Sequence, residues 1–184
     1  VTGLNPDAKT ITVKTAEGEH EANYDKLLLS PGGYAPKLNV EGKDLEHVYT
    51  FRGRDDAELV KARMADAKKV VVIGGGYIGI EVAEAYVKNG QEVTVIDAID
   101  RFLPTYLDKE FYAALTKEAA EKGLAFKGNE SVKEIKGANG AATAVVTDKG
   151  EYEADTVIMA VGVKADTAWL EGTLDMDEKG FVKV

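Results

Sequence analysis

The chain has 184 residues, of which 45% are hydrophobic and 30% charged, a size and composition that suit one globular domain, or one domain with part of another. Its 32 acidic and 23 basic residues give a net charge of −9, so nucleic acid and anionic membranes are not expected as partners. The absence of cysteine excludes disulfides, thiolate zinc sites and thiol catalysis within these residues, and the two histidines form no metal-binding pattern.

The first residues and the apolar runs of the chain indicate its location in the cell. No run approaches the length of a membrane-spanning helix, and the first residues lack the basic and apolar regions of a signal peptide. We therefore expect a soluble, cytoplasmic protein. Because the chain lacks an initiator Met, we also expect it to be a piece of a longer one.

The first third of the chain is predicted to be rich in β-structure. Thr10–Thr15 alternates with period two, and a mixed strand follows over His20–Asn23. The apolar run Lys26–Ser30 suits a buried parallel strand that ends in a tight Pro-Gly-Gly loop. Tyr34–Thr50, with one Pro and one Gly, is expected to be a connector.

From Asp55 the apolar residues recur at helical spacing. The pattern then predicts strands and helices in alternation, with glycines after the helices as C-terminal caps and Asp108 as an N-terminal cap. The expected ranges are strands Lys69–Ile73 and Glu92–Asp97, and helices Tyr77–Asn89 and Asp108–Lys122.

The last part of the chain predicts a three-stranded antiparallel insert. Val132–Lys136 and Ala142–Thr147 flank Ala138-Asn139-Gly140, which is a strong hairpin signal, and Glu151-Tyr152 follows. Thr156–Val161 is continuously apolar, as in a strand buried on both faces. The predicted fold class is therefore α/β: a Rossmann-like parallel sheet with helices on both faces and a three-stranded antiparallel β insert.

The central motif follows a predicted strand and opens a predicted helix. Gly74, Gly76 and Gly79 satisfy G-x-G-x-x-G, with Gly75, Tyr77 and Ile78 between them. The first glycine permits the tight turn, the second lets a pyrophosphate approach the backbone, and the third lets the helix pack on the sheet. The free N–H groups at the start of the helix then bind the phosphates. A structural glycine turn is the alternative.

Asp97 completes this motif. It closes the next strand, 18 residues beyond Gly79, close to the spacing of an acidic residue that binds the adenosine ribose. Its carboxylate would repel a 2′-phosphate, so NAD is favoured over NADP. Arg101 lies nearby and could take a phosphate, but Asp100 beside it argues against this.

These segments together resemble the FAD-dependent pyridine nucleotide-disulfide oxidoreductases, and most of all the NADH peroxidase and NADH oxidase branch. The resemblance covers nearly the whole chain. Besides the glycine loop it rests on five segments: Tyr24–Gly32, Arg52-Gly53-Arg54, Val95-Ile96-Asp97, Tyr106–Phe111 and Ala160–Val163.

The resemblance implies a division of the chain. Residues 1–50 would be part of a FAD-binding domain, residues 51–162 the NAD-binding Rossmann domain, and residues 163–184 a return toward the FAD domain. Ser30, Pro31, Gly32 and Gly33 match a loop that contacts FAD, although by themselves they also suit a strand-ending turn. Arg52 matches a basic residue near the same cofactor.

The resemblance also implies residues that contact NADH. Tyr77 matches an aromatic gate over the flavin, although a packing role at a helix start is the alternative. Glu81 matches a carboxylate at the nicotinamide end and would otherwise be a solvated helix residue. Tyr106 matches a tyrosine that contacts the dinucleotide, and Gly162 a loop beside the nicotinamide ribose; otherwise they are an ordinary aromatic and a strand-to-loop turn.

Other features of the family have no counterpart in this sequence. These are the first glycine motif for FAD, the redox cysteine with its histidine, and a later Gly-Asp motif. The resemblance implies a parent protein that is a flavin-dependent NADH peroxidase and a homo-oligomer, because Thr167–Leu174 and Arg52-Gly53-Arg54 look closer to the peroxidase than to the oxidase. Because this chain lacks cysteine, we expect it to be inactive alone. Its partners would be NADH and the remainder of its own FAD and dimerisation domains. A water-forming NADH oxidase, a coenzyme A-disulfide reductase and a non-catalytic dinucleotide sensor are the alternatives.

Overall fold

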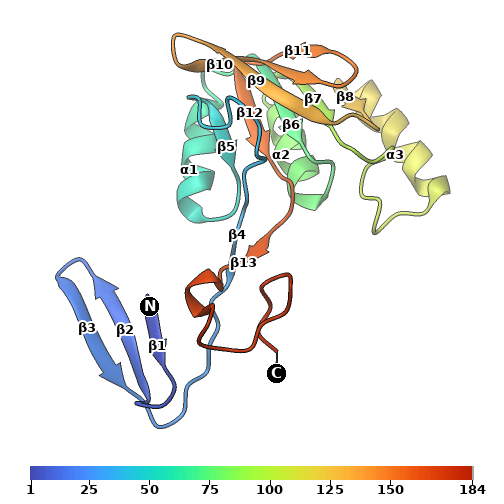
Figure 1. The fold of residues 1–184 in the computed structure, drawn as a ribbon. Helices are drawn as coiled ribbons and strands as arrows, with labels where there is room; N and C mark the ends of the chain where they lie inside the picture. Colours follow the sequence, from blue (N-terminus) through green and yellow to red (C-terminus); the bar gives the residue numbers. More distant parts are fainter. Residues whose placement is uncertain (184) are drawn as a thin grey trace. The chain divides into compact units, whose positions relative to one another are not determined.

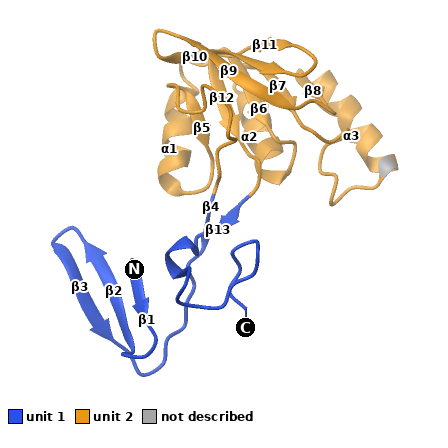
Figure 2. Ribbon diagram, in the orientation of Figure 1, with its two compact units in different colours: residues 1–34, 163–184 blue, residues 35–162 orange. Residues whose placement is uncertain are grey.

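The computed structural model describes residues 1–183, and of Lys109 only the backbone. The chain divides into two compact units, one formed by residues 35–162 and the other by residues 1–34 together with 163–184 (Figure 2). The glycine loop, Asp97 and the predicted alternation of strands and helices all belong to the larger unit.

The larger unit is built on a sheet of five parallel strands in the order β5-β12-β6-β7-β8. Its central strand, β6, has the sequence Lys-Val-Val-Val-Ile, and its last four residues are buried. Such a run of β-branched residues suits a strand that is covered on both faces. The strand bounds are β5 (Val48–Thr50), β12 (Thr156–Met159), β6 (Lys69–Ile73), β7 (Glu92–Ile96) and β8 (Leu124–Lys127).

Three helices cover one face of this sheet, namely α1 (Arg54–Arg63), α2 (Tyr77–Lys88) and α3 (Lys109–Glu121). The other face is covered by an antiparallel sheet of β9 (Val132–Ala138), β10 (Ala141–Thr147) and β11 (Glu151–Glu153), seen above the strands in Figure 1. Alternate residues of β6 separate the two cores: Val70 and Val72 pack with the helices, and Val71 and Ile73 with the antiparallel sheet.

The α/β class, the parallel sheet and the antiparallel insert are confirmed, but the expectation of helices on both faces is wrong in this detail. The three helical crossovers, β5 to β6, β6 to β7 and β7 to β8, all step in the same direction along the sheet. Because such crossovers are right-handed, all three helices fall on the same face. The return from β8 to β12 runs in the opposite direction, and the antiparallel strands occupy that connection.

Local details follow the sequence in most places. Asn139 and Gly140, with φ of 54° and 88°, turn the chain between β9 and β10, as the hairpin signal predicts. Asp108 stands at the N-cap of α3, but its side chain makes no capping hydrogen bond. The segment expected to be a connector contains β5, an edge strand of three residues that pairs with β12.

The smaller unit contains an antiparallel sheet of β1 (Gly3–Asn5), β2 (Thr10–Thr15) and β3 (Gly18–Asn23). A short pair, β4 (Gly33–Tyr34) with β13 (Lys164–Ala165), and the 3-10 turn η1 (Ala168–Leu170) complete it. The predicted strand Lys26–Ser30 is wrong, because this segment has no strand conformation and Leu28 is 93% exposed. A parallel strand needs neighbours for its backbone hydrogen bonds, and none of the described residues pairs with this segment.

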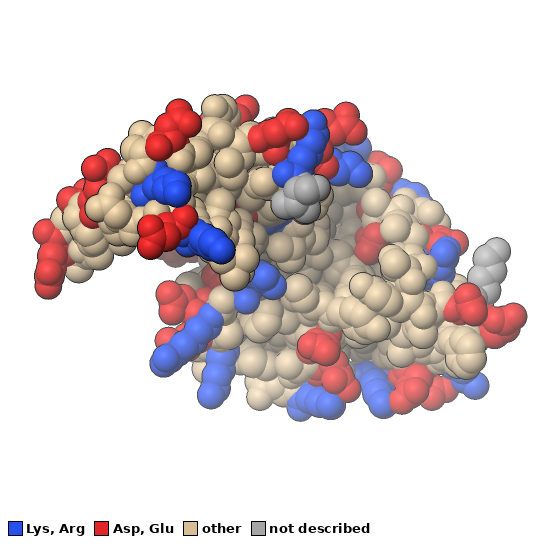
Figure 3. Space-filling model, turned by 90° about the horizontal axis from the view of Figure 1, so that it is seen from below, with Lys and Arg blue, Asp and Glu red and all other residues tan. Residues whose placement is uncertain are grey.

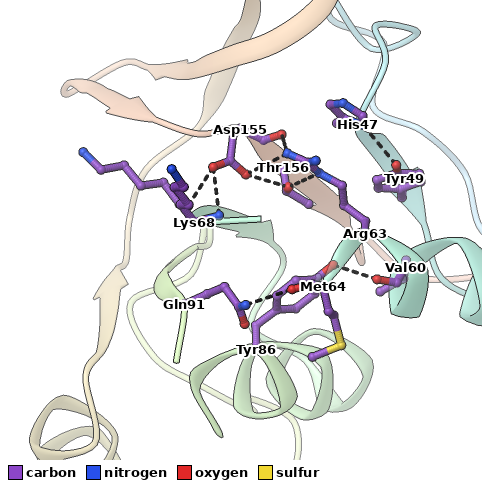
Figure 4. Close-up of polar contacts among 11 residues, drawn as sticks. His47, Tyr49, Val60, Arg63, Met64, Lys68, Tyr86, Gln91, Asp155 and Thr156 are labelled. Carbon is purple, nitrogen blue, oxygen red and sulfur yellow. Dashed lines mark hydrogen bonds and ion pairs between the residues drawn. The ribbon is translucent and has the colours of Figure 1, made fainter. Parts of the chain in front are cut away.

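A polar network joins α1 to the amino ends of β6 and β12 (Figure 4). The guanidinium of Arg63 donates to the Thr156 hydroxyl at 3.0 Å and to the Asp155 carboxylate at 3.2 Å. That carboxylate also accepts the backbone N–H groups of Lys68 and Lys69 at 2.9 and 3.0 Å. Burial raises the pKa of Asp155, but these hydrogen bonds, the Thr156 hydroxyl and the charge of Arg63 outweigh it and lower the pKa.

Acidic and basic side chains are interspersed over the face drawn in Figure 3. Among the described residues, no helix combines the length and apolarity needed to cross a membrane.

Candidate functional site

The glycine loop joins the carboxyl end of β6 to the start of α2. Gly74 has φ of 109°, and a Cβ there would lie 2.4 Å from the carbonyl oxygen of Ala160. Its N–H group donates to the carbonyl oxygen of Ile96 at 2.8 Å. Only glycine meets both demands, a left-handed backbone and a close approach to the neighbouring strand. The turn therefore places the start of α2 at the edge where β6, β7 and β12 end.

Gly79 fixes the distance between α2 and this loop. It is buried in the helix, and a Cβ at this position would lie 1.9 Å from the carbonyl oxygen of Gly74. A side chain here would push the helix away from the loop, because the nearest atoms are backbone atoms of Gly74, which cannot move aside as a flexible side chain can.

Gly76 differs from the other glycines of the motif, because nothing lies within 4 Å of the position of its Cβ. It is the N-cap of α2, with extended backbone angles of −78° and −175°, and the helix has neither a side-chain cap nor an acidic residue in its first turn. The N–H groups of that turn have no intrahelical partner. The result is a space bordered by hydrogen-bond donors at the positive end of a helix, which suits a phosphate group.

Asp97 is tied to the glycine loop by its carboxylate. One oxygen accepts the N–H group of Gly75 at 2.6 Å, and the other accepts the N–H group of Ile99 at 2.8 Å. Each carboxylate oxygen can accept a further hydrogen bond, so Asp97 keeps capacity for ribose hydroxyls. Arg101 forms an ion pair with Asp100 at 2.7 Å.

An aromatic pair beneath Gly75 and Asp97 was not foreseen from the sequence. The rings of Phe102 and Phe126 lie 4.1 Å apart between centroids, and Phe102 is fully buried. A Cβ on Gly75 would be 3.3 Å from the Asp97 carboxylate, 3.4 Å from Phe126 and 3.5 Å from Phe102. The N–H group of Leu103 also donates to the Gly75 carbonyl at 3.0 Å. The aromatic pair thus supports the loop from below.

The structure brings two of the predicted aromatic residues together. The rings of Tyr77, at the start of α2, and Tyr106, in the loop before α3, are 4.3 Å apart between centroids. Both side chains are largely exposed, at 52% and 61%. Exposed aromatic rings at the mouth of a site provide surfaces against which a planar ligand can stack.

The remaining predicted residues of the larger unit surround the loop less closely. Ile78 and Glu81 line a cavity of about 260 Å³ between α1 and α2. Gly162 follows β12, is exposed, and has φ of 100° with open space around it. Arg52 is exposed just before α1, and its backbone N–H donates to Asp56 at 2.8 Å.

The predicted FAD loop lies in the smaller unit. Ser30, Pro31 and Gly32 are exposed and line an open cavity together with Leu170 and Phe181. Gly33 belongs to β4, where a Cβ would lie 2.6 Å from the carbonyl oxygen of Lys164.

Comparison with known proteins identifies the family. Residues 1–184 match the sequence pattern of the pyridine nucleotide-disulphide oxidoreductases. The chain is 37% identical to an NADH oxidase of Enterococcus faecalis in an alignment that covers 98% of this chain and 41% of that protein.

Solved structures give the same result. A water-forming NADH oxidase from Lactobacillus brevis bound to NADH superposes with a TM-score of 0.90 at 32% identity, over 97% of this chain and 40% of that one. Its engineered form bound to NADPH gives 0.91 at 30% identity, over 98% of this chain and 40% of that one. The chain therefore spans about two fifths of the length of these relatives, and it belongs to the pyridine nucleotide-disulphide oxidoreductase family.

Proposed function

We propose that the chain is the NADH-binding part of a flavin-dependent oxidoreductase. The observation that carries this proposal is the open space at Gly76, beside the first turn of α2, with Asp97 held 2.6 Å from the Gly75 N–H group. The pyrophosphate of the dinucleotide would lie at the first turn of α2, and its adenosine ribose would donate to Asp97. When bound, the nicotinamide supplies a hydride for the flavin of the longer protein.

The preference for NADH over NADPH is part of the proposal, because a carboxylate repels a 2′-phosphate. The engineered NADPH-bound relative supports it, since that form carries an aspartate-to-alanine and an adjacent alanine-to-arginine substitution. In this chain, too, Asp97 is an aspartate followed directly by an alanine, Ala98.

The nicotinamide half of the ligand is proposed to contact Tyr77, Tyr106, Glu81 and Gly162. The support for the two tyrosines is that their exposed rings lie 4.3 Å apart between centroids at the loop, and the support for Gly162 is its open left-handed backbone. Ser30–Gly33 and Arg52 are proposed to contact FAD in the longer protein, and their exposure leaves them available for this.

The electron acceptor is proposed to be hydrogen peroxide or dioxygen. The segments Thr167–Leu174 and Arg52–Arg54 resemble NADH peroxidase, whereas the relatives compared above are NADH oxidases. Peroxide reduction in this family proceeds through a thiolate, and the sequence has no cysteine. We therefore propose that the chain binds NADH but does not turn it over alone, and that the acceptor is decided by residues outside it.

Calorimetric titration of the chain with NADH and NADPH tests the proposal. We expect NADH to bind more tightly, and Asp97→Ala to weaken NADH by about 1–3 kcal/mol while leaving NADPH less affected. Equal or tighter binding of NADPH by the unchanged chain would contradict the assignment of Asp97. Added FAD with peroxide or oxygen should give no protein-dependent loss of NADH absorbance.

A further inference from the structure

Glu130, in the loop between β8 and β9, is an acidic side chain buried to an unusual degree, with 7% of its surface exposed. The hydroxyl of Thr147 donates to one carboxylate oxygen at 2.8 Å, and the hydroxyl of Tyr152 lies 2.8 Å from both oxygens. These hydroxyls belong to β10 and β11. Because burying a carboxylate costs free energy even when its oxygens are satisfied, Glu130 calls for a role beyond filling the core.

The backbone of the same loop holds the segment that contains Asp97. The N–H group of Glu130 donates to the carbonyl oxygen of Asp97 at 3.0 Å, and that of Asn129 donates to Ile99 at 3.1 Å. In return, the N–H group of Asp97 donates to the carbonyl oxygen of Lys127 at 3.0 Å. Three hydrogen bonds therefore connect residues 127–130 with residues 97–99.

The two segments are also in steric contact, so one cannot shift without the other. A Cβ on Gly128 would lie 2.9 Å from the carbonyl oxygen of Ile99 and 3.0 Å from the carbonyl carbon of Asp100. Asn129 takes a left-handed backbone with φ of 56°, which is strained for most residues. A conformation of this kind persists where its surroundings enforce it, and the fixed carboxylate of Glu130 is next in the chain.

We propose that Glu130 is a positioning residue for the dinucleotide. Its carboxylate, held by Thr147 and Tyr152, anchors the loop whose backbone fixes Asp97 beside Gly75. The antiparallel sheet thereby contributes to cofactor selection, although it supplies no residue to the glycine loop. This inference rests on the proposed function, in which Asp97 accepts the adenosine ribose.

The test compares the affinities for NADH and NADPH in variants of Glu130. Glu130→Ala should weaken NADH about fivefold or more, as expected for the loss of a buried hydrogen-bonded group, with little effect on NADPH, so that the preference falls. Tyr152→Phe keeps the ring and removes one donor, and it should lower the preference about twofold. Glu130→Gln should restore most of it, because the amide can still bond both hydroxyls.

Thr156→Val is the matched control. Like Glu130, Thr156 is a buried polar residue in a hydrogen-bonded network, but it lies at the amino end of β12, away from Asp97 along the strands. It should lower the melting temperature without changing the preference for NADH. In an Asp97→Ala background, Glu130→Ala should produce no further loss of NADH affinity.

The outcomes distinguish a failure of the proposed function from a failure of the positioning role of Glu130. If the unchanged chain does not bind NADH, the proposed function fails. If it binds NADH, but Glu130→Ala keeps the preference for NADH over NADPH, the positioning role is overturned. The same holds if Thr156→Val loses this preference to the same extent. Should Glu130→Ala not fold, an unchanged preference in Tyr152→Phe overturns the role instead. Additive losses in the Asp97→Ala background overturn it as well.

Discussion

The substitution Gly76→Ala should weaken NADH binding while leaving the fold nearly unchanged. Gly76 has φ of −78° and ψ of −175°, angles that alanine adopts without strain. A Cβ at this position meets no atom of the chain within 4 Å. The methyl group therefore occupies only the space that we assign to the pyrophosphate.

The expected effects on stability nearly cancel. Replacing glycine stabilises by about 0.4–1 kcal/mol through the unfolded chain, while alanine is a poorer N-cap than glycine by roughly as much. The melting temperature should then move by no more than about 2–4 °C. Binding should suffer far more, because losing a hydrogen bond to a charged phosphate costs about 1.5–3 kcal/mol, a factor of roughly 10 to 150 in Kd.

Calorimetry with NADH and a thermal melt of each variant measure the two effects. Gly53→Ala is the matched control: Gly53 is the extended N-cap of α1, and a Cβ there also meets nothing within 4 Å. It should change stability to a similar extent and leave NADH binding intact. If Gly76→Ala bound NADH like the unchanged chain, the pyrophosphate would not lie at this turn and the reasoning would be refuted.

Three further changes test the packing and the polar contacts of the larger unit. Gly79→Ala should destabilise the chain by about 1–3 kcal/mol in denaturant unfolding, since its Cβ would lie 1.9 Å from the Gly74 carbonyl oxygen; unchanged stability would mean that α2 packs differently. Phe102→Ala should cost about 3–5 kcal/mol in the same assay, because Phe102 is fully buried; a loss under about 1 kcal/mol would contradict its supporting role. Asp155 has a pKa below its ordinary value of 3.8 in the folded chain, so its stabilisation is complete above that pH and is lost as the pH falls through the folded-state pKa. Asp155→Asn should therefore flatten the fall of melting temperature in acid, and an equally steep fall would show that this carboxylate is not responsible.

The parts of the fold that the sequence predicts well are those with a local signal. The apolar run of β6, the helical spacing of α2 and the Asn139-Gly140 turn each carry their structure in a few adjacent residues. The sequence also predicts the glycine loop and Asp97, because the spacing between a G-x-G-x-x-G motif and its acidic residue is fixed.

The parts that were missed depend on partners distant in sequence. Lys26–Ser30 has the composition of a buried strand, but composition does not reveal whether a neighbouring strand is present. The placement of all helices on one face follows from strand order, which no single segment encodes. Glu130 and Phe102 were overlooked because their roles depend on contacts with Tyr152, Thr147 and Phe126.

The central claim is that a dinucleotide binds where β6, α2 and the end of β7 meet. Backbone amide shifts of isotope-labelled protein, followed by NMR during titration with NADH, test it most directly. We predict that the largest changes fall on Gly75, Gly76, Tyr77 and Ile99, and that Lys68 and Thr156 at the opposite edge of the sheet stay unchanged. Changes centred on Lys68 and Thr156, with the glycine loop unaffected, would contradict the account.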